Sequence, residues 1–318
     1  MKIFYLDELT DSQSPCVATI GFFDGVHLGH QHLINKVREE ARQRDLPSTV
    51  VTFERHPRQV LQPQWHPQLL STPEEKVALL AQTSIDQLVI LRFDAAMAAL
   101  SAYDFMNDIL RQKIGVSTLV TGYDNHFGHR TANSDEGFDD YVNYGKELGI
   151  SVIKGSPFIT DRHVRVSSSR IRNFLLEGDV CEAANCLGRP YEIGGTIVSG
   201  QHIGTALGFP TANLQPSDNS KLIPAPGAYA VQVRLEDSPE WFGGMMNIGC
   251  RPTFGGDHLT LETHIFNFSD NVYDRHLIIR FINRLRAERQ FDNREALIEQ
   301  LAADARQAEE ILNQTPHI

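Results

Sequence analysis

The sequence lacks any apolar run of the length that crosses a membrane, which takes about 18 residues or more. Its first twenty residues include Lys2, Asp7, Glu8 and Asp11, so they do not have the apolar centre of a secretory signal peptide. Positive charge is also scarce, because 29 Lys and Arg stand against 40 Asp and Glu over 318 residues. The net charge of −11 argues against general nucleic-acid binding, which depends on a basic face. We therefore expect a cytoplasmic protein with neither nucleic-acid nor membrane partners.

Cysteine is rare, and the common glycine-rich nucleotide motifs are missing. The cysteines form no CxxC pair and have no histidine at zinc-ligand spacing, so we expect reduced side chains in packing roles; they are Cys16, Cys181, Cys186 and Cys250. Neither GxxxxGKS/T nor GxGxxG occurs, which removes the main support for a P-loop protein or a dinucleotide-fold oxidoreductase. Other groups must hold any bound nucleotide.

The first half of the chain predicts a parallel sheet covered by helices. Strand-like runs alternate with amphipathic segments in the rhythm of βαβ units. The runs are residues 17–20, 49–53, 88–91, 116–120 and 150–153. A capping box from Thr72 to Glu75, with Pro73 at the first helical position, predicts a helix start, and Gly115 and Gly149 predict helix ends.

After Gly188 the pattern changes to strands without intervening helices. The strand-like runs are residues 191–198, 228–235, 242–248, 259–266 and 277–282, separated by Gly, Pro, Asp and Asn. This pattern predicts an antiparallel sheet or a small barrel. Helical spacing from Leu297 to Leu312 predicts a terminal helix that covers an open end of it. Because the length is typical of two domains, we place one at residues 1–186 and the other at residues 187–318.

The string GFFDGVHLGH, residues 21–30, lies where the first predicted strand passes into the first helix. Free N–H groups and the helix dipole favour an anion at such a junction, and His27 and His30 can face the same phosphate. Attack on an α-phosphate adds negative charge to its oxygens, which cationic or hydrogen-bond-donating imidazoles would stabilise. The string therefore suits nucleotidyl transfer. The alternative is two polar turn residues at a strand end.

A second string, VSSSRIR at residues 166–172, places serines just before a helix that contains arginines. Hydroxyls and amides at a helix start, with an arginine one turn inside, form a phosphate cradle suited to the β- and γ-phosphates of a nucleotide. The alternative is a serine N-cap followed by solvated arginines.

Two features of the second half suggest another phosphate-transfer site. The segment GTALGFPTAN, residues 204–213, joins a glycine-bearing loop to Thr211 and Asn213, whose neutral oxygens could bind Mg²⁺. Glu262 lies on a mostly apolar strand, where it could accept a proton from an attacking hydroxyl. The alternatives are a surface loop and a solvent-facing strand residue.

Together these strings resemble those of the bacterial bifunctional riboflavin kinase/FAD synthetases. The further matching strings are residues 52–57 (TFERHP), 122–128, 187–191 (LGRPY), 207–214, 227–229 (GAY), 247–253 (NIGCRPT), 262–264 (ETH) and 285–288 (LRAE). The resemblance implies an α/β N-terminal nucleotidyltransferase domain with a Rossmann-like parallel sheet and a C-terminal riboflavin kinase domain built on a six-stranded antiparallel β-barrel. It implies synthesis of FMN from riboflavin and ATP, then of FAD and pyrophosphate from FMN and a second ATP, with Mg²⁺. Flavoproteins would receive the FAD.

The resemblance also implies roles for individual residues. In the first domain, catalysis would fall to His27, His30 and Arg172, and ATP contacts to Gly21, Phe22, Asp24, Gly29, Ser168 and Ser169. In the kinase, Glu262 would be the base, Thr211 and Asn213 would bind Mg²⁺, and Gly204, Gly208 and Asn247 would contact ATP. Flavin contacts would come from His56 and Asp124 in the first domain and from Arg286 in the kinase.

Five positions depart from the pattern of the family: Asn125, His126, Asn133, Thr205 and Gln290. Thr205 replaces a common arginine of the kinase phosphate loop, and Gln290 replaces a common lysine near the flavin. Because the catalytic positions are intact, we expect activity with altered binding. Two alternatives remain: a single-activity adenylyltransferase would need only the motifs of the first domain, and a non-enzymatic flavin sensor would be expected to lack His30 or Glu262.

Overall fold

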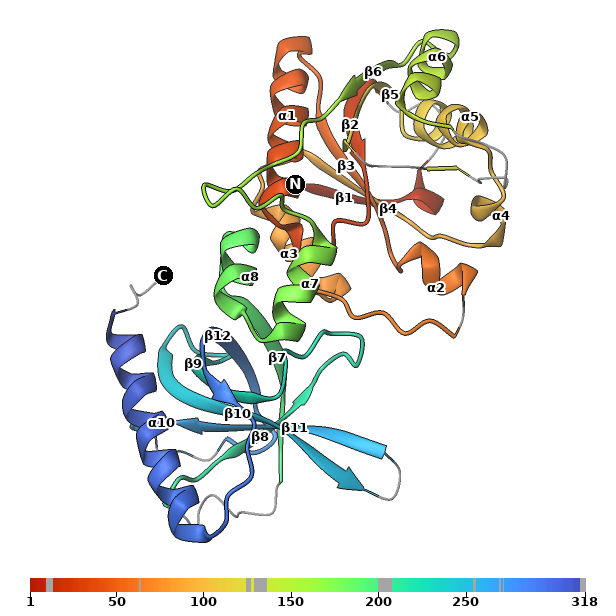
Figure 1. Cartoon of the computed structure of the whole chain (residues 1–318). Helices are drawn as coiled ribbons and strands as arrows, with labels where there is room; N and C mark the ends of the chain where they lie inside the picture. Colours follow the sequence, from red (N-terminus) through yellow and green to blue (C-terminus); the bar gives the residue numbers. More distant parts are fainter. Residues whose placement is uncertain are drawn as a thin grey trace. The chain divides into compact units, whose positions relative to one another are not determined.

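The structure of the chain is a computed structural model, shown in Figure 1. It describes residues 1–9, 14–62, 64–123, 127–128, 136–199, 208–253, 256–268, 270 and 272–314, with the side chains of residues 250–258 excepted. The positions discussed above that lie outside the described residues are Asp11, Asp124, Asn125, His126, Asn133, Gly204 and Thr205. The chain divides into two compact units, Met1–Ser168 and Ser169–Ile318. Every helix in the described ranges is too short or too polar to span a bilayer.

The first unit contains a six-stranded sheet in which all neighbouring strands are parallel. Its strands are β1 (Lys2–Tyr5), β2 (Cys16–Ile20), β3 (Ser48–Phe53), β4 (Gln87–Leu91), β5 (Val116–Thr121) and β6 (Ser151–Lys154). They lie in the order β1-β4-β3-β2-β5-β6, so the chain moves to one side of β2 for β3 and β4 and to the other side for β5 and β6. Such a reversal opens a crevice at the carboxyl ends of the central strands, where open parallel sheets bind ligands. The five predicted strands are present, and the edge strand β1 is additional.

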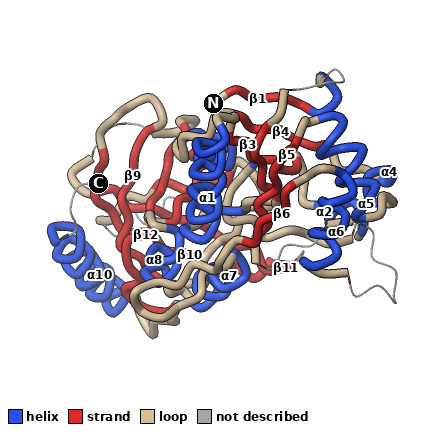
Figure 2. Tube along the Cα trace, turned by 90° about the horizontal axis from the view of Figure 1, so that it is seen from above, coloured by secondary structure: helices blue, strands red, loops and turns tan. Residues whose placement is uncertain are grey.

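Helices cover both faces of this sheet. On one face lie α1 (Leu28–Arg44) and α3 (Pro73–Ala81); on the other lie η1 (Leu6–Glu8), α5 (Ala102–Asp104), the π-helical η3 (Phe105–Lys113) and α6 (Phe138–Leu148). Figure 2 shows the strands between α1 and the pair α5 and α6. β2 packs against the helices on both faces because its side chains alternate. Val17 packs with α1, whereas Ala18 and Ile20 belong to the core on the opposite face. The predicted capping box of α3 is confirmed, because the side chains of Thr72 and Glu75 each accept the other's N–H.

In the second unit six strands close into a barrel in which all neighbours are antiparallel. They are β7 (Tyr191–Val198), β8 (Ala212–Pro216), β9 (Gly227–Leu235), β10 (Trp241–Thr253), β11 (Gly256–Ile265) and β12 (His276–Ala287). The order around the barrel is β10-β11-β8-β7-β12-β9. The fold class expected from the resemblance is thereby confirmed. β8 is not among the predicted strands, because only Ala212 and Leu214 of its five residues are buried.

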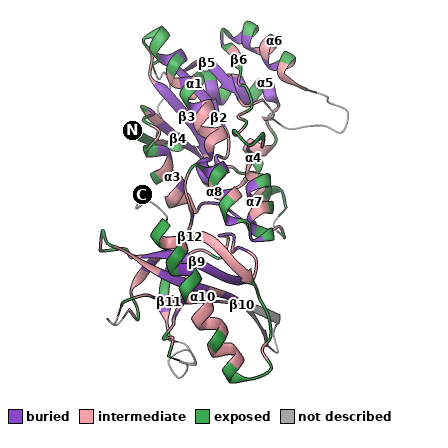
Figure 3. Cartoon of the chain, turned by 60° about the vertical axis from the view of Figure 1, so that its left-hand side comes forward, coloured by how far each residue is buried: buried purple, intermediate pink, exposed green. Residues whose placement is uncertain are grey.

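The helices of the second unit are α8 (Val180–Leu187), α10 (Arg294–Gln314) and nearly all of α7 (Ser168–Glu177). α8 packs on β7 and β12. α10 packs on the neighbouring strands β9, β10 and β12, with Leu301 and Ala308 against Ala230 and Met245. The terminal helix therefore lies along the barrel wall and not over an open end, which corrects the prediction. Figure 3 shows the buried residues gathered in the strands and a largely half-buried or exposed α10.

The cysteines follow the prediction in part. Cys16, Cys181 and Cys186 form no disulfide. Cys16 and Cys186 are buried, as a packing role requires, but Cys181 is exposed, so that role is wrong for this residue. The side chain of Cys250 lies outside the described part of the structure.

Candidate active sites

The turn between β2 and α1, which contains η2 (Asp24–Val26), has an unusual backbone. Phe23, Gly25 and Val26 have φ values of 55°, 77° and 39°, in the left-handed region that favours glycine. For the β-branched Val26 this is a genuine outlier, of a kind that persists at functional sites where the surroundings enforce it. The buried Asp24 provides such a constraint, because its carboxylate accepts hydrogen bonds from the backbone N–H groups of residues 70 and 71. The carboxylate that we predicted to contact ATP therefore braces this turn.

His27 is the N-cap of α1. Its Nδ1 accepts a hydrogen bond from the backbone N–H of His30 at 3.2 Å, so the proton of the neutral His27 ring lies on Nε2. The two imidazole rings stack, with centroids 3.6 Å apart and planes 13° from parallel. Gly29 allows this arrangement, because a Cβ there would lie 3.1 Å from both Cε1 and Nδ1 of His27. The HxGH spacing thus has a steric reason as well as a chemical one.

His30 is held as a neutral imidazole. Its Nδ1 is buried and has no hydrogen-bond partner among the described residues, and the edge of its ring meets Phe23 with centroids 5.0 Å apart. Burial, followed by electrostatic repulsion from His27, lowers the pKa of His30 well below its ordinary value. Of the two forms expected from the sequence, cationic or hydrogen-bond-donating, the structure favours the neutral donor.

Ser168 links the two predicted phosphate strings. Its Oγ donates a hydrogen bond to the carbonyl oxygen of Asp24 at 3.1 Å, so the VSSSRIR string begins beside the HxGH turn. Ser169 and Arg172 follow on α7, in the second compact unit. Gly21 lies directly after the end of β2, at the edge of the sheet where the crevice opens.

Phe22 and His56 come together although they lie far apart in the sequence. Their rings meet edge to face with centroids 4.6 Å apart. His56 caps α2 (Pro57–Leu61), because its side chain accepts a hydrogen bond from the N–H of Arg58. Lys76 also contacts this cluster: its Nζ lies 4.1 Å from the centroid of the Phe22 ring and donates a hydrogen bond to the Phe53 carbonyl at 2.7 Å. A predicted ATP contact and a predicted flavin contact therefore share one cluster of side chains.

Lys76 is a candidate site residue that the sequence analysis did not identify. Its side chain is buried, and burial lowers its pKa to about 8, while the negative charge of Asp24 acts in the opposite direction. A signal for it was present in the sequence, because Lys76 lies one turn before the buried Leu80 on the apolar face of α3. Lysine is almost never fully buried without a partner.

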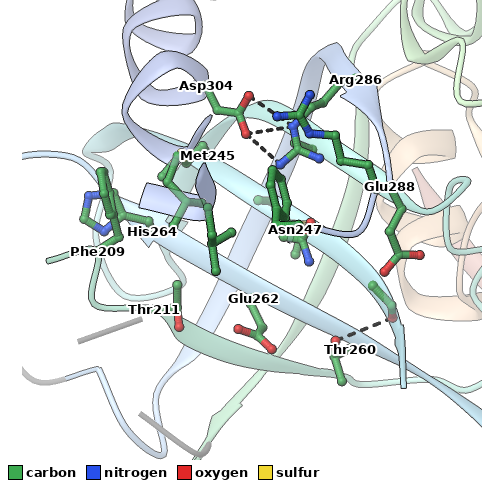
Figure 4. Close-up of a pocket in the computed structure, with 17 residues that line it drawn as sticks. Phe209, Thr211, Met245, Asn247, Thr260, Glu262, His264, Arg286, Glu288 and Asp304 are labelled. Carbon is green, nitrogen blue, oxygen red and sulfur yellow. Dashed lines mark hydrogen bonds and ion pairs between the residues drawn. The ribbon is translucent and has the colours of Figure 1, made fainter. Parts of the chain in front are cut away.

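A cavity of about 300 Å³ lies in the barrel wall beside α10 (Figure 4). It brings together residues that the sequence predicted, namely Thr211, Asn247, Glu262 and Arg286. It also contains residues that the sequence analysis did not assign, among them Phe209, Met245, Thr260, His264, Glu288, Arg289, Phe291 and Asp304. The cavity thus combines apolar and polar side chains, which is typical of a small-molecule site.

Glu262 lies in the middle of β11, directly opposite Asn247 on β10 and Asn213 on β8. Its sequence neighbours Leu261 and Thr263 are buried, whereas Glu262 is half-buried and lines the cavity. Because side chains alternate along a strand, Glu262 shares a face with the cavity-lining Thr260 and His264. Its position is therefore that of a cavity residue and not of a solvent-facing one.

Arg286 is held in place by Asp304 of α10. Its Nε lies 3.2 Å and 3.0 Å from the two carboxylate oxygens, and its Nη2 lies 2.8 Å from one of them. The Asp304 side chain is only 2% exposed, and Gln300 donates a further hydrogen bond to it. The guanidinium also lies 5.6 Å from the centroid of the Phe291 ring. Asp304 could have been found from the sequence as the acidic residue on the apolar face of the terminal helix.

Three other predicted positions lie outside this lining. Asn213 lies next to the site, because it is directly opposite Glu262 in the pairing of β8 with β11. Gly208 has a φ of 86°, which explains a glycine there. Gln290 is exposed.

Two family models cover most of the chain. Residues 9–170 match FAD synthetase, and residues 187–312 match riboflavin kinase. The chain belongs to the bifunctional riboflavin kinase/FMN adenylyltransferase family. It phosphorylates riboflavin to FMN with ATP and adenylylates FMN to FAD with a second ATP, releasing pyrophosphate. Because both halves match, neither a single-activity adenylyltransferase nor a flavin sensor describes the chain.

Curated relatives with the name of this family align along nearly the whole chain. The one from Pseudomonas fluorescens is 36% identical over 98% of both chains, and the one from Bacillus subtilis is 33% identical over 94% of this chain and 93% of its own. Among solved structures, the chain is similar to a Streptococcus pneumoniae protein described as a macrolide-efflux protein. The TM-score is 0.86 and the identity 30%, over 97% of this chain and 99% of that one.

Proposed function

We propose that the kinase reaction takes place in the barrel-wall cavity and that adenylyl transfer takes place at the stacked histidines. The observation that carries this assignment is the register of three strands, in which Glu262 lies between Asn213 and Asn247. A carboxylate flanked by amides on the wall of a partly apolar cavity can meet both a hydroxyl and a nucleotide.

In the kinase step, the Glu262 carboxylate accepts the proton of the ribityl 5′-hydroxyl while that oxygen forms a bond to the γ-phosphorus of ATP. The bond between the γ-phosphorus and the bridging oxygen breaks, so that FMN and ADP form and the proton stays on Glu262. Asn247 and the backbone at Gly208 contact ATP, and Arg286 forms part of the flavin site. Asp304 keeps the guanidinium in one orientation, because it binds two of its nitrogens.

The oxygen donors near Glu262 fit Mg²⁺. Thr211 lines the cavity and Asn213 lies opposite Glu262, so a hydroxyl and an amide, both hard ligands, come from one short segment. Within the described ranges, no group of three or more His, Cys, Asp or Glu could hold a metal ion alone. This agrees with the usual binding of Mg²⁺ through a few protein oxygens, waters and substrate phosphates. Thr211 and Asn213 would hold the ion, and bound Mg²⁺ would neutralise charge on the phosphates of ATP.

In the adenylylation step, a phosphate oxygen of FMN attacks the α-phosphorus of ATP, and the bond to the departing pyrophosphate breaks. The attacking oxygen is already an anion, so this step needs no general base. Negative charge grows on the α-phosphate oxygens, and His27 and His30 donate hydrogen bonds to them as neutral rings. Gly21, Phe22, Gly29, Ser168, Ser169 and Arg172 contact ATP, and His56 contacts the flavin. Neither reaction requires a covalent enzyme intermediate.

We also propose the boundary between the two domains at residues 186 and 187. It is supported by the riboflavin kinase match, which begins at residue 187, and by the first barrel strand, which begins at Tyr191, although α7 and α8 group with the barrel in the compact unit that begins at Ser169. The FAD product would pass to flavoproteins. A cytoplasmic location would supply the ATP that both steps consume.

Two variants of the full chain test these assignments. Each is incubated with riboflavin, ATP and Mg²⁺, and riboflavin, FMN and FAD are separated by chromatography. We expect His30→Ala to lower FAD formation by roughly 10²-fold or more, the scale of one transition-state donor, and to leave FMN formation unchanged. We expect Glu262→Gln to lower FMN formation by roughly 10²- to 10⁴-fold, the scale of general-base catalysis, while FAD still forms from supplied FMN.

The matched control is His32→Ala. His32 is the next histidine of α1 and lies outside the stack, with its Nε2 3.0 Å from Ser156 Oγ. We expect it to keep both activities. Equal loss of both activities in well-folded His30→Ala or Glu262→Gln would contradict the assignment of two separate sites.

A further inference from the structure

His264 occupies a position on β11 that the mechanism above does not use. It lies two residues after Glu262 on the same face of the strand, and both residues line the cavity. Figure 4 shows its ring beside Phe209, which belongs to the segment that leads into Thr211. His264 is therefore close to the proposed Mg²⁺-ATP ligands although it was assigned no role.

The backbone of this segment has little support from the strand ladder. The register pairs between β11 and β8 are Glu262 with Asn213 and Thr263 with Ala212. The pairing of these described residues stops before Thr211, and the preceding residue, Pro210, has no N–H to donate. The ladder thus ends next to a residue whose placement the kinase reaction needs.

The ring of His264 holds the backbone by a hydrogen bond at the point where the pairing of β11 with β8 ends. Its Nδ1 lies 2.8 Å from the carbonyl oxygen of Pro210. Because a carbonyl oxygen only accepts hydrogen bonds, Nδ1 carries the proton. Phe209 and Phe266 meet the ring in T-shaped contacts, with centroids 5.5 Å and 5.7 Å away, and both phenyl groups pack against the core beneath α10. The donor is therefore held in one orientation before any substrate binds.

We propose that His264 is a positioning residue of the kinase reaction, which holds the segment from Phe209 to Asn213 at a fixed place beside Glu262. This inference rests on the proposed role of Thr211 and Asn213 in binding Mg²⁺-ATP. Because Thr211 and Asn213 are the proposed ligands of Mg²⁺-ATP, a shift of their backbone weakens ATP binding, so a hydrogen bond to the residue before Thr211 affects the KM for ATP without a contact to ATP.

The test compares His264→Leu with His264→Asn in the full chain. Asn can place its Nδ2 donor near the position of the His264 Nδ1–H, whereas Leu fills space and donates nothing. We expect His264→Leu to raise the KM for ATP in FMN formation about tenfold, the scale of one hydrogen bond, and His264→Asn to recover most of that loss. Riboflavin binding, followed by flavin fluorescence, should be the same in both variants.

Two controls accompany this comparison. FAD formation from supplied FMN, measured on the same samples, should be unchanged. His276→Leu alters another barrel histidine, whose Nε2 lies 2.9 Å from Ser217 Oγ and which does not line the cavity, so it should keep the parental KM for ATP.

A further variant, Thr211→Val, separates the two ways in which the inference can fail. If Thr211→Val raises the KM for ATP but His264→Leu does not, the positioning role is wrong and the ATP site stands. If Thr211→Val also leaves the KM unchanged, the proposed ATP site is wrong and the inference fails with it. If His264→Asn raises the KM for ATP as much as His264→Leu does, the hydrogen bond does not control ATP binding and the proposal is overturned. If His264→Leu does not fold, a raised KM in His264→Asn overturns the proposal in the same way.

Discussion

Gly29 lies against the ring of His27, so closely that a Cβ on Gly29 would approach its Cε1 and Nδ1 to 3.1 Å. That is tighter than nine in ten natural contacts of a Cβ, so the ring or the start of α1 would have to move by a few tenths of an ångström. Because the His27 ring stacks on His30 with centroids 3.6 Å apart, such a movement disturbs both donors.

Gly29→Ala should therefore separate stability from activity. We expect the rate of FAD formation to fall about tenfold, because small misalignments of catalytic groups are costly. We expect the free energy of unfolding to stay equal or to rise, by about 0.5–1 kcal/mol at most, because alanine has a higher helix propensity than glycine. Steady-state kinetics and urea denaturation check these expectations. A parental rate of FAD formation would show that the rings tolerate the extra methyl group.

The buried Lys76 should make the stability of the first unit depend on pH. Its pKa is about 8 in the folded chain and 10.5 ordinarily. Between these values the unfolded chain binds a proton that the folded chain has released, so stability rises with pH, by about 1.4 kcal/mol per pH unit at most. Below pH 8 both states are protonated, and the full cost of burying the charge is present.

This pH dependence is measured as a difference between variants. Other groups titrate in the same range, so the quantity to follow is the unfolding free energy of the parent minus that of Lys76→Met. A Trp241→Phe background leaves Trp65 as the sole tryptophan, which makes its fluorescence a reporter of the first unit. We expect the difference to increase from pH 8 to pH 10. A difference that does not change with pH would mean that Lys76 titrates normally.

Removal of both Arg286 and Asp304 should weaken flavin binding more than it weakens the fold. Asp304→Asn leaves a largely buried guanidinium without its counter-ion, which costs about 3–5 kcal/mol. The double variant Arg286→Met/Asp304→Leu removes both charges and should recover most of that stability. We expect neither variant to bind riboflavin as tightly as the parent, as measured by fluorescence titration.

The matched control for this pair is Glu192→Gln. Glu192 forms an ion pair with Arg280 on the barrel, but neither residue lines the cavity. We expect this variant to bind riboflavin normally. Parental riboflavin affinity in the double variant would exclude Arg286 from the flavin site.

Fragments should test the boundary between the two activities. We expect residues 1–186 to convert FMN to FAD and to leave riboflavin untouched, and residues 187–318 to make FMN and stop there. A fragment of residues 169–318 should also make FMN and should melt at a higher temperature, because it keeps the buried face of α8 that packs on β7 and β12. Chromatography of the flavins and thermal melting measure both. If the folded fragments were inactive, each site would need residues from the other half.

The fold was largely readable from the sequence, because its main elements carry regular patterns. Alternating and continuous apolar runs predicted ten of the strands, since burial on one or both faces leaves that record in consecutive residues. β1 and β8 escaped prediction because β1 has only four residues and lies at the start of the chain, and because β8 contains Asn213 and Pro216, which are uncommon in strands. The position of α10 also escaped, because helical periodicity reports that a face is buried but not what covers it.

Some properties of the candidate sites follow from the sequence, and others depend on the tertiary structure. The sequence alone determined the motif strings, the family they resemble and four of the residues on the cavity wall, because these lie in short strings whose order along the chain is kept. Only the tertiary structure decided that the His27 and His30 rings stack, that His30 is neutral, and that Asp24 braces a turn. Only it paired His264 with Pro210, which lies 54 residues away, and joined Lys76 to Phe22. The physical reason is that protonation, orientation and partners depend on which distant residues exclude water around a group, and no local pattern records that.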